Sequence, residues 1–292
     1  MLKYYNLLIV ALESVINFFI VLILNIKTIF QRNRFPKGEE YIQIIGNGPS
    51  LNDDLPKIFE TSKSCETLVV NTFANSDLFD ELKPRYYVIV DPYFFFPENR
   101  QRHIEIQKKT IESLIAKTSW ELNLLIPANA VNSVIVKQLK LRNTNIKVIP
   151  IKNIPTIGGF KFLNQFFFKL NLANPFFANV LVAAIFFCIK MNFKNILIWG
   201  ADHSWHHDFY LGKDNILYTP ERHFFDKDKK IGIPYTNEAG VPMRFDEVLL
   251  MLARGFREYH MIRKYADSLK VNIANLSSNT WVDAFNREIF KN

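Results

Sequence analysis

The chain has only two cysteines among its 292 residues, Cys65 and Cys188. They stand far apart in apolar surroundings, which excludes a disulfide framework and the paired spacing of a cysteine-zinc site. We expect both to be free thiols in a protein of a reducing compartment.

Internal repeats, low-complexity segments and clusters of basic residues are lacking as well. The formal net charge of +8 comes from scattered residues that are not interleaved with aromatic ones, which argues against a nucleic-acid partner. A basic protein of this kind fits a nucleotide or a phospholipid surface better. With 49% hydrophobic residues, the chain can bury the core of one large domain, with or without a small lid.

A long apolar stretch covers residues 7–30, and about 20 apolar residues suffice to span a bilayer as a helix. Glu13, Asn17 and Lys27 interrupt it, so a helix lying in the membrane interface and a buried globular helix stay open as alternatives. A cleaved signal peptide is not expected, because the stretch is long and no small-residue cleavage site follows it.

Basic residues lie mainly on the C-terminal side of this stretch. Lys27, Arg32, Arg34 and Lys37 follow it, whereas only Lys3 precedes it. The positive-inside rule therefore predicts an inner-membrane protein whose main domain faces the cytoplasm. We divide the chain into a membrane-anchor helix with a basic linker over residues 1–38 and a nucleotide-binding α/β domain over residues 39–292.

From residue 41 onward, short and nearly continuous apolar runs alternate with longer helical stretches. The predicted strands are Tyr41–Ile45, Thr67–Val70, Tyr86–Val90, Asn123–Ile126, Ile146–Ile149, Asn195–Trp199 and Val271–Ala274. The predicted helices are Leu55–Thr61, Glu98–Lys117, Val131–Gln138, Ala178–Met191 and Glu247–Leu269. This alternation predicts a mostly parallel sheet with helices on both faces. Residues from about 204 to 244 have no clear period and predict an irregular lid.

Four predicted strands end in glycine or polar residues. Ligands of open α/β sheets bind beyond the carboxyl ends of the strands, so these ends predict a nucleotide site. Its candidate residues are Gly46, Asn47, Gly48, Pro49, Ser50, Asn71, Asp91, Gly200, Asp202 and Ser204. The glycine turn at 46–50 can bring backbone N–H groups to a phosphate, although an ordinary strand-to-helix turn has the same residues.

Histidines and tyrosines near the predicted lid supply candidates for catalysis. His203 or His223 could act as a general base, with Asp226 orienting His223. Tyr210 could bond a leaving phosphate, or it could simply pack on the domain. His203, His206, His207 and Asp208 do not follow a recognised zinc spacing, so we predict no metal site.

Several of these motifs resemble a known family. Ile44–Leu51 resembles the opening of bacterial lipooligosaccharide sialyltransferases that use CMP-sialic acid, and Val70–Phe73 and Val90–Pro92 resemble their second and third strand ends. Residues 180–205 resemble their long helix and the strand that follows. The Gly-x-Gly-Pro-Ser-Leu and Gly-Ala-Asp elements are also similar to MptE-like domains, which occur in a pterin diphosphokinase and in Maf flagellin glycosyltransferases.

The resemblance implies a Rossmann-like, GT-A-like fold and inverting transfer from a CMP-activated sugar without a metal-binding Asp-x-Asp motif. It implies that Asn47 and Gly48 meet the nucleotide phosphate, that Asn71 and Asp91 meet the ribose or cytosine, and that Tyr210 bonds the leaving phosphate. Asp91 stands where the family has asparagine. Asn179, in a segment where the family has Arg-x-Thr-Ser, is a further candidate for the nucleotide site.

We therefore expect a membrane-associated glycosyltransferase of surface-polysaccharide or lipooligosaccharide biosynthesis. It would transfer a sialic-acid-like sugar from a CMP-linked donor to a lipid-linked or glycan acceptor, with no required cofactor. Two alternatives stay open: an MptE-like diphosphokinase that uses ATP and Mg²⁺, and a non-catalytic nucleotide-binding subunit of a polysaccharide assembly machine. The sequence leaves the oligomeric state open.

Overall fold

A computed structural model describes residues 2–25, 35–96, 101–156, 158–219, 232–237 and 240–288. Within these ranges a seven-stranded parallel sheet has the strand order β10-β6-β1-β2-β3-β4-β5. Its strands are β1 (Tyr41–Ile45), β2 (Glu66–Val70), β3 (Tyr86–Val88), β4 (Leu122–Pro127), β5 (Ile146–Ile151), β6 (Asn195–Trp199) and β10 (Asn272–Asn275). All seven predicted strands are confirmed, with ends that shift by at most two residues.

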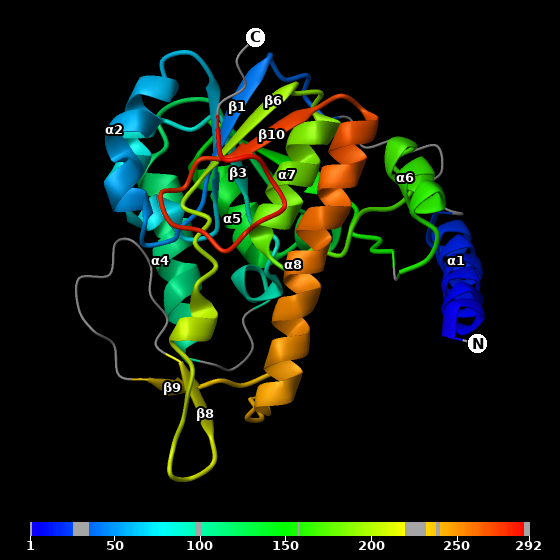
Figure 1. Cartoon of the computed structure of the whole chain (residues 1–292). Coiled ribbons are helices and arrows are strands. Elements are labelled where there is room, and N and C mark those ends of the chain that lie inside the picture. The colour runs from blue at the N-terminus through cyan, green and yellow to red at the C-terminus, as the bar shows by residue number, and fades with distance from the viewer. Residues whose placement is uncertain are drawn as a thin grey trace.

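Helices cover both faces of this sheet (Figure 1). The helices of the described residues are α1 (Leu2–Asn25), α2 (Leu51–Thr61), α3 (Leu78–Leu82), α4 (Gln101–Lys117), α5 (Val134–Arg142), α6 (Lys161–Lys169), α7 (Val180–Lys190) and α8 (Phe245–Ser268), of which α1 and α6 lie to one side of the sheet in Figure 1. The predicted helices are present as α2, α4, α5, α7 and α8, whereas α3 and α6 were not predicted. Both are short, with five residues in α3 and nine in α6.

Alternate residues of each strand enter two separate hydrophobic cores. Ile44 and Val88 face the layer that contains α7 and α8, whereas Ile45 and Ile89 face the layer that contains α2, α4 and α5. Because both faces are buried, the strands read as continuous apolar runs. Helix α7 is buried from Val180 to Ile189, which explains its lack of a polar face.

The predicted lid holds regular structure in the parts that the structure describes. Strands β7 (Tyr210–Leu211), β8 (Leu217–Thr219) and β9 (Ile233–Pro234) pair antiparallel as a small separate sheet. This sheet projects away from the main sheet, beyond the end of α4 in Figure 1.

One helical stretch among the described residues, Tyr4–Asn25, is long and apolar enough to cross a membrane. That judgement rests on its length and on a mean hydropathy of 2.7. The stretch agrees with the predicted N-terminal anchor helix.

Candidate functional site

A cavity of about 470 Å³ opens at the carboxyl ends of the central strands. Strand β1 lies between β2 and β6, so the strand order reverses there, and ligands of open α/β sheets bind at such a reversal. The predicted residues that line the cavity are Asn47, Gly48, Pro49, Asn71, Asp91, Asn179, Gly200, Asp202, His203 and Ser204. The four predicted strand ends are thus neighbours around one cavity.

Three backbone donors of the glycine turn after β1 are bonded within the protein. The N–H of Gly46 donates to the Trp199 carbonyl at 2.8 Å, and the N–H of Gly48 donates to the Gly200 carbonyl at 3.0 Å. Ser50 donates its N–H and its hydroxyl to the two carboxylate oxygens of Asp202, at 3.0 and 2.7 Å. The N–H groups of Gly46, Gly48 and Ser50 therefore do not point at a phosphate in this structure.

Close packing explains why the turn needs glycine. A Cβ on Gly48 would lie 1.9 Å from Asp202 Oδ2, and a Cβ on Gly46 would lie 2.5 Å from the Gly200 carbonyl oxygen. Gly46 and Ser50 do not line the cavity. We call Gly46, Gly48, Ser50, Gly200 and Asp202 the β1–β6 clamp, because they join the ends of these two strands.

Asp202 supplies the negative charge at the start of α2 that a bound phosphate would otherwise supply. Burial raises the pKa of this carboxyl above its ordinary value, and the hydrogen bonds from Ser50 oppose that rise. The start of α2 is therefore occupied by the protein itself.

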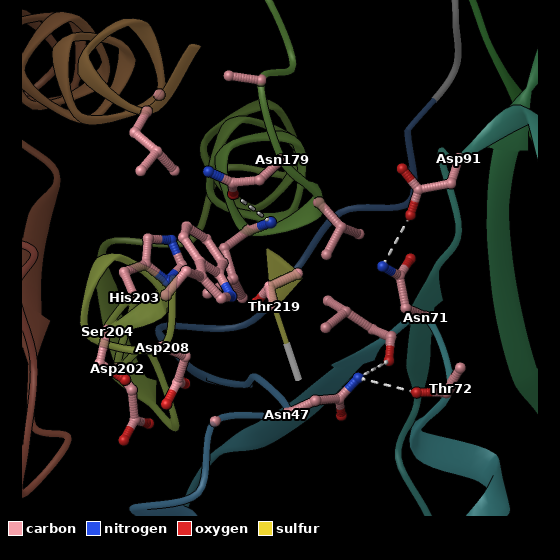
Figure 2. A pocket seen from close by; sticks show the side chains of 18 of the residues that line it. Asn47, Asn71, Thr72, Asp91, Asn179, Asp202, His203, Ser204, Asp208 and Thr219 are labelled. Atoms are coloured by element: carbon pink, nitrogen blue, oxygen red, sulfur yellow. Dashed lines mark hydrogen bonds between the residues drawn. The ribbon is translucent and has the colours of Figure 1, made fainter. Parts of the chain in front are cut away.

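The ends of β2 and β3 form a polar wall with Asn47, and here acceptors are left over. Asn47 donates through Nδ2 to the Val70 carbonyl and to Thr72 Oγ1, each at 3.3 Å, and Asn71 Nδ2 donates to Asp91 Oδ2 at 2.8 Å (Figure 2). Within the described residues, the buried Oδ1 atoms of Asn47 and Asn71 have no hydrogen-bond partner. Such atoms are costly unless a ligand or water bonds to them.

Two further features shape the polar wall, which consists of Asn47, Asn71, Thr72 and Asp91. Asn71 has a positive φ of 48°, which asparagine tolerates better than most residues. Desolvation raises the pKa of Asp91, and the hydrogen bond from Asn71 partly offsets this rise. The wall therefore places two amide side chains and a carboxylate at the cavity, with the Oδ1 atoms of Asn47 and Asn71 buried behind its surface.

His203 belongs to a hydrogen-bonded relay that ends at α7. Asn179 caps that helix, because its Oδ1 accepts from the N–H groups of Leu181 and Val182 at 3.0 and 3.1 Å. The same oxygen accepts the hydroxyl proton of Tyr259 at 2.9 Å. Since Tyr259 has only one proton, its oxygen must accept from Nε2 of His203, 2.5 Å away.

This relay fixes His203 as a neutral imidazole with its proton on Nε2. Burial lowers the pKa of His203 to about 3, because the charged ring would lose its hydration. A ring with so low a pKa removes protons poorly near neutral pH. These contacts argue against His203 as the general base and favour a role in positioning.

Aromatic side chains form the wall opposite the polar one. Trp205 stacks on His203 with centroids 4.3 Å apart, and Phe256 lies edge-on to the same ring. Phe209 packs edge-on against Tyr235. Burial raises the pKa of Tyr235. Four of these residues line the cavity and form what we call the aromatic wall: Trp205, Phe209, Tyr235 and Phe256.

The sequence reasoning missed the aromatic wall, together with Thr72, Tyr93, His103, Thr219, Met251 and Gly255, which also line the cavity. Trp205, Phe209 and Tyr235 lie in the predicted lid, and their aromatic character was the available signal. Thr72 and Tyr93 follow predicted strands directly. Residues of α8 gave no signal, because they fit an ordinary amphipathic helix.

The predicted catalytic residue Tyr210 does not line the cavity. It lies on β7 with 49% of its surface exposed and stacks on Tyr218 at 5.5 Å. Its pairing with Tyr218 makes it part of the small β7–β8–β9 sheet. His223, with its predicted partner Asp226, lies outside the described residues.

Other titratable residues of the region form contacts outside the cavity. His206 and His207 pack edge-on against Trp281, at 4.4 and 5.0 Å between centroids. In the part of the chain that the structure describes, no three histidine, cysteine, aspartate or glutamate side chains come close enough to hold a metal ion.

Comparison with known proteins gives limited information. No family model and no curated protein matches the chain. Among solved structures it is similar to the Maf glycosyltransferase from Magnetospirillum magneticum AMB-1, with 12% identity and a TM-score of 0.48 over 87% of this chain and 34% of that one. The chain spans about a third of the length of that protein, and a similarity of this size carries no conclusion about activity.

Proposed function

We propose that the chain is a glycosyltransferase that binds a nucleotide-activated sugar, with CMP as the nucleotide, in the cavity at the β1–β6 reversal. One observation carries this proposal: the side chains of Asn47, Asn71 and Asp91 line one side of the cavity, opposite the aromatic wall. A volume of about 470 Å³ lies within the range typical of small-molecule sites. The motifs that resemble CMP-dependent sialyltransferases support the choice of nucleotide.

The polar wall would hold the nucleoside. Amide and carboxylate oxygens accept hydrogen bonds, so Asn71 and Asp91 suit ribose hydroxyls or the amino group of cytosine. The flat faces of Trp205 and Tyr235 suit the base or the sugar ring. This wall carries the negative charge of Asp91, so the phosphate would lie away from it.

The start of α7 is the better place for the phosphate. The start of α2 already accommodates Asp202, whereas Ala178, Asn179, Val180 and Leu181 bring the first turn of α7 to the cavity wall. The partial positive charge of a helix N-terminus favours an anion there. Tyr93 and Tyr235 line the cavity, unlike the predicted Tyr210, and Tyr235 could bond the leaving phosphate.

In the proposed reaction a base removes the proton of the acceptor hydroxyl, whose oxygen attacks the anomeric carbon while the bond to the CMP phosphate breaks. His203 would position the aromatic wall, and His223 is the remaining candidate base from the sequence. Separate His223→Ala and His203→Asn variants test these roles. Loss of transfer with retained CMP binding is expected for the first, and full activity there would remove His223 as the base.

The nucleotide can be identified by thermal shift with CMP, UMP, AMP and ATP, each with EDTA or with Mg²⁺. We expect CMP to stabilise the protein equally in both conditions. Asp91→Ala should lose most of this shift, whereas Asp53→Ala, at an exposed position of α2 outside the cavity, should keep it. The absence of a shift with every nucleotide would overturn the proposal.

A diphosphokinase is the second candidate, favoured by the carboxylates of Asp202 and Asp208 at the same side of the cavity in Figure 2. Mg²⁺ commonly binds through one or two carboxylates together with substrate phosphates. Stabilisation by ATP that requires Mg²⁺, with release of AMP, would select this candidate. Binding of CMP without turnover on any glycan or lipid-linked acceptor would select the non-catalytic subunit.

A further inference from the structure

The polar residues of α1 lie on one stripe that docks on the protein body. Glu13 accepts the N–H of Gly159 at 2.8 Å, and Ser14 Oγ accepts the N–H of Phe160 at 2.7 Å. Asn17 donates to the Gly158 carbonyl at 3.2 Å. Glu13 and Asn17, two of the residues that interrupt the apolar stretch in the sequence, are therefore used for docking.

The contact continues to the C-terminal end of the helix. Asn25 is 2% exposed and donates to the Leu172 carbonyl at 2.9 Å, and Val21 is buried between these polar positions. From Glu13 to Asn25 the docked stripe is about 18 Å long at 1.5 Å per residue. About half the length of α1 is therefore held against the loops that flank α6.

The rest of the surface of α1 is apolar and exposed. Its large exposed side chains are Tyr4, Tyr5, Leu7, Leu8, Ile9, Leu12, Val15, Ile16, Phe18, Phe19, Leu22, Ile23 and Leu24. A continuous apolar surface of this extent is unusual on a protein that faces only water. The carboxylate of Glu13 and the backbone groups of residues 158–160 face the opposite, docked side.

A helix that crosses a bilayer conflicts with this docking. The hydrocarbon core is about 30 Å thick, so a crossing α1 would carry the 158–172 segment into it along about 18 Å of helix. Irregular backbone is not tolerated where it meets lipid. The body must therefore stay on the water side along the docked half of α1.

Helix α6 adds a second apolar surface beside the first. Phe162, Phe166 and Leu170 follow one another at intervals of four residues, so they share one helix face, and they are 70%, 55% and 43% exposed. In Figure 1, α1 and α6 lie together at one side of the molecule, away from the sheet. An apolar face of this kind on a short helix suits the boundary between headgroups and acyl chains.

Basic residues accompany the apolar face of α6. Lys161 and Lys169 stand at its two ends. The ammonium groups of Lys161 and Lys264 are close enough to repel each other, which lowers the pKa of Lys161. An anionic headgroup between them would relieve this repulsion.

We propose that α1 and α6 form a lipid-binding platform that lies along one leaflet of a membrane, without crossing it. Exposed apolar side chains of both helices enter the acyl boundary, and Lys161, Lys169 and Lys264 contact anionic headgroups. The platform does not depend on the proposed enzymatic function.

The contribution of α6 can be measured with the full chain and lipid vesicles. Phe166→Cys, labelled with the environment-sensitive dye NBD, should show a blue shift and at least a twofold rise in emission with vesicles of phosphatidylcholine and phosphatidylglycerol. Leu141→Cys on α5, 83% exposed, is the matched control and should show neither. The unsubstituted chain measures background labelling of its own two cysteines.

Two outcomes of this experiment would contradict a role for α6: no spectral change at Phe166→Cys, or an equal change at Leu141→Cys. Vesicles of pure phosphatidylcholine should give a smaller change than the anionic ones. Lys161→Ser with Lys264→Ser should abolish that difference.

The topology of α1 needs a separate test. A cysteine in a short flexible extension ahead of Met1 can be labelled with a membrane-impermeant maleimide in inverted and in right-side-out vesicles. Labelling on the same side as a cysteine at exposed Asp53 is expected. Labelling on the opposite side would show that α1 crosses the bilayer and would overturn the proposal.

Discussion

The turn after β1 and the turn after β2 look alike in the sequence, since each places small polar residues directly after a buried strand. They differ in their hydrogen bonds. After β1 the N–H groups of Gly46, Gly48 and Ser50 are all bonded to the β6 end, whereas after β2 the Asn71 amide oxygen is buried without a partner among the described residues. The backbone donors of the first turn therefore hold β1 to β6, whereas the second turn, together with Asn47, contains amide oxygens that no described residue bonds.

The largest effect on stability is expected from a substitution that disrupts the β1–β6 clamp. Gly48→Ala places a methyl group 1.9 Å from Asp202 Oδ2 and 2.6 Å from the Gly200 carbonyl, which must separate the ends of β1 and β6. We expect a loss of about 3 kcal/mol in the free energy of unfolding, measured by urea denaturation. A change below about 0.5 kcal/mol, the range of ordinary surface substitutions, would show that the clamp yields easily.

The end of β6 carries His203, whose protonation at low pH is expected to destabilise the folded protein. The pKa of His203 is about 3 when folded and about 6.5 when unfolded, so the unfolded state takes up the proton first as pH falls. The contribution of this ring to the free energy of unfolding is fully present above pH 6.5. It declines below that pH, by about 2 to 3 kcal/mol down to pH 4.5. His203→Asn, which tolerates the φ of 52°, should remove this part of the decline.

The control for this pH dependence is His260→Asn, which changes an exposed histidine of α8. It should keep the acid-dependent decline of the wild type in urea denaturation at a series of pH values. Equal pH profiles for the wild type and His203→Asn would contradict a buried neutral ring.

Two aspartates test the comparison directly. Asp202→Asn leaves one Ser50 donor facing an amide NH₂ group, so we expect a loss of about 2 kcal/mol in stability. Asp91→Ala removes a desolvated charge together with the acceptor of Asn71 Nδ2, so stability should change by about 1 kcal/mol or less while CMP binds at least tenfold more weakly. Calorimetric titration and urea denaturation measure both quantities, and a reversed pattern would place the ligand at the clamp.

The smallest expected effect is a gain in stability, from a substitution of Gly255 in α8. Gly255 lies within α8 at the cavity, where an added Cβ would meet only Ala178 Cβ at 3.8 Å and Asn179 Nδ2 at 4.0 Å. Gly255→Ala should therefore stabilise the protein by about 0.5 to 1 kcal/mol, since glycine is unfavourable inside a helix. The larger Gly255→Leu should reduce CMP binding by filling the cavity, and unchanged binding there would separate α8 from the site.

The strand pattern could be predicted because burial on both faces leaves a clear signal in the sequence. The seven strands and the meeting of four strand ends at one cavity followed from apolar runs and from the general rule for parallel sheets. Helix α6 was not predicted, although its exposed Phe162 and Phe166 and its buried Phe167 and Phe168 follow a helical period, because it is only nine residues long.

The finer contacts of the site could not be predicted, because they join distant parts of the chain. Tyr259 looks like a core residue of α8, yet its hydroxyl links His203 to Asn179 and decides where the imidazole proton lies. Asp202 looked like a ligand-binding residue, yet it caps α2. Tyr210 was placed by resemblance, and the small β7–β8–β9 sheet positions it elsewhere.

The β1–β6 clamp also has a consequence for the synthesis of the protein on the ribosome. Ser50 and Asp202 are 152 residues apart, whereas the polar wall is complete once residue 91 has been made. At 5 to 20 residues per second, the ribosome adds Asp202 roughly 8 to 30 s after Ser50. During that interval the start of α2 lacks the carboxylate of Asp202, and β1 lacks β6 as its neighbouring strand. Defects of the clamp should therefore appear first as greater dependence on chaperones and a lower expression yield.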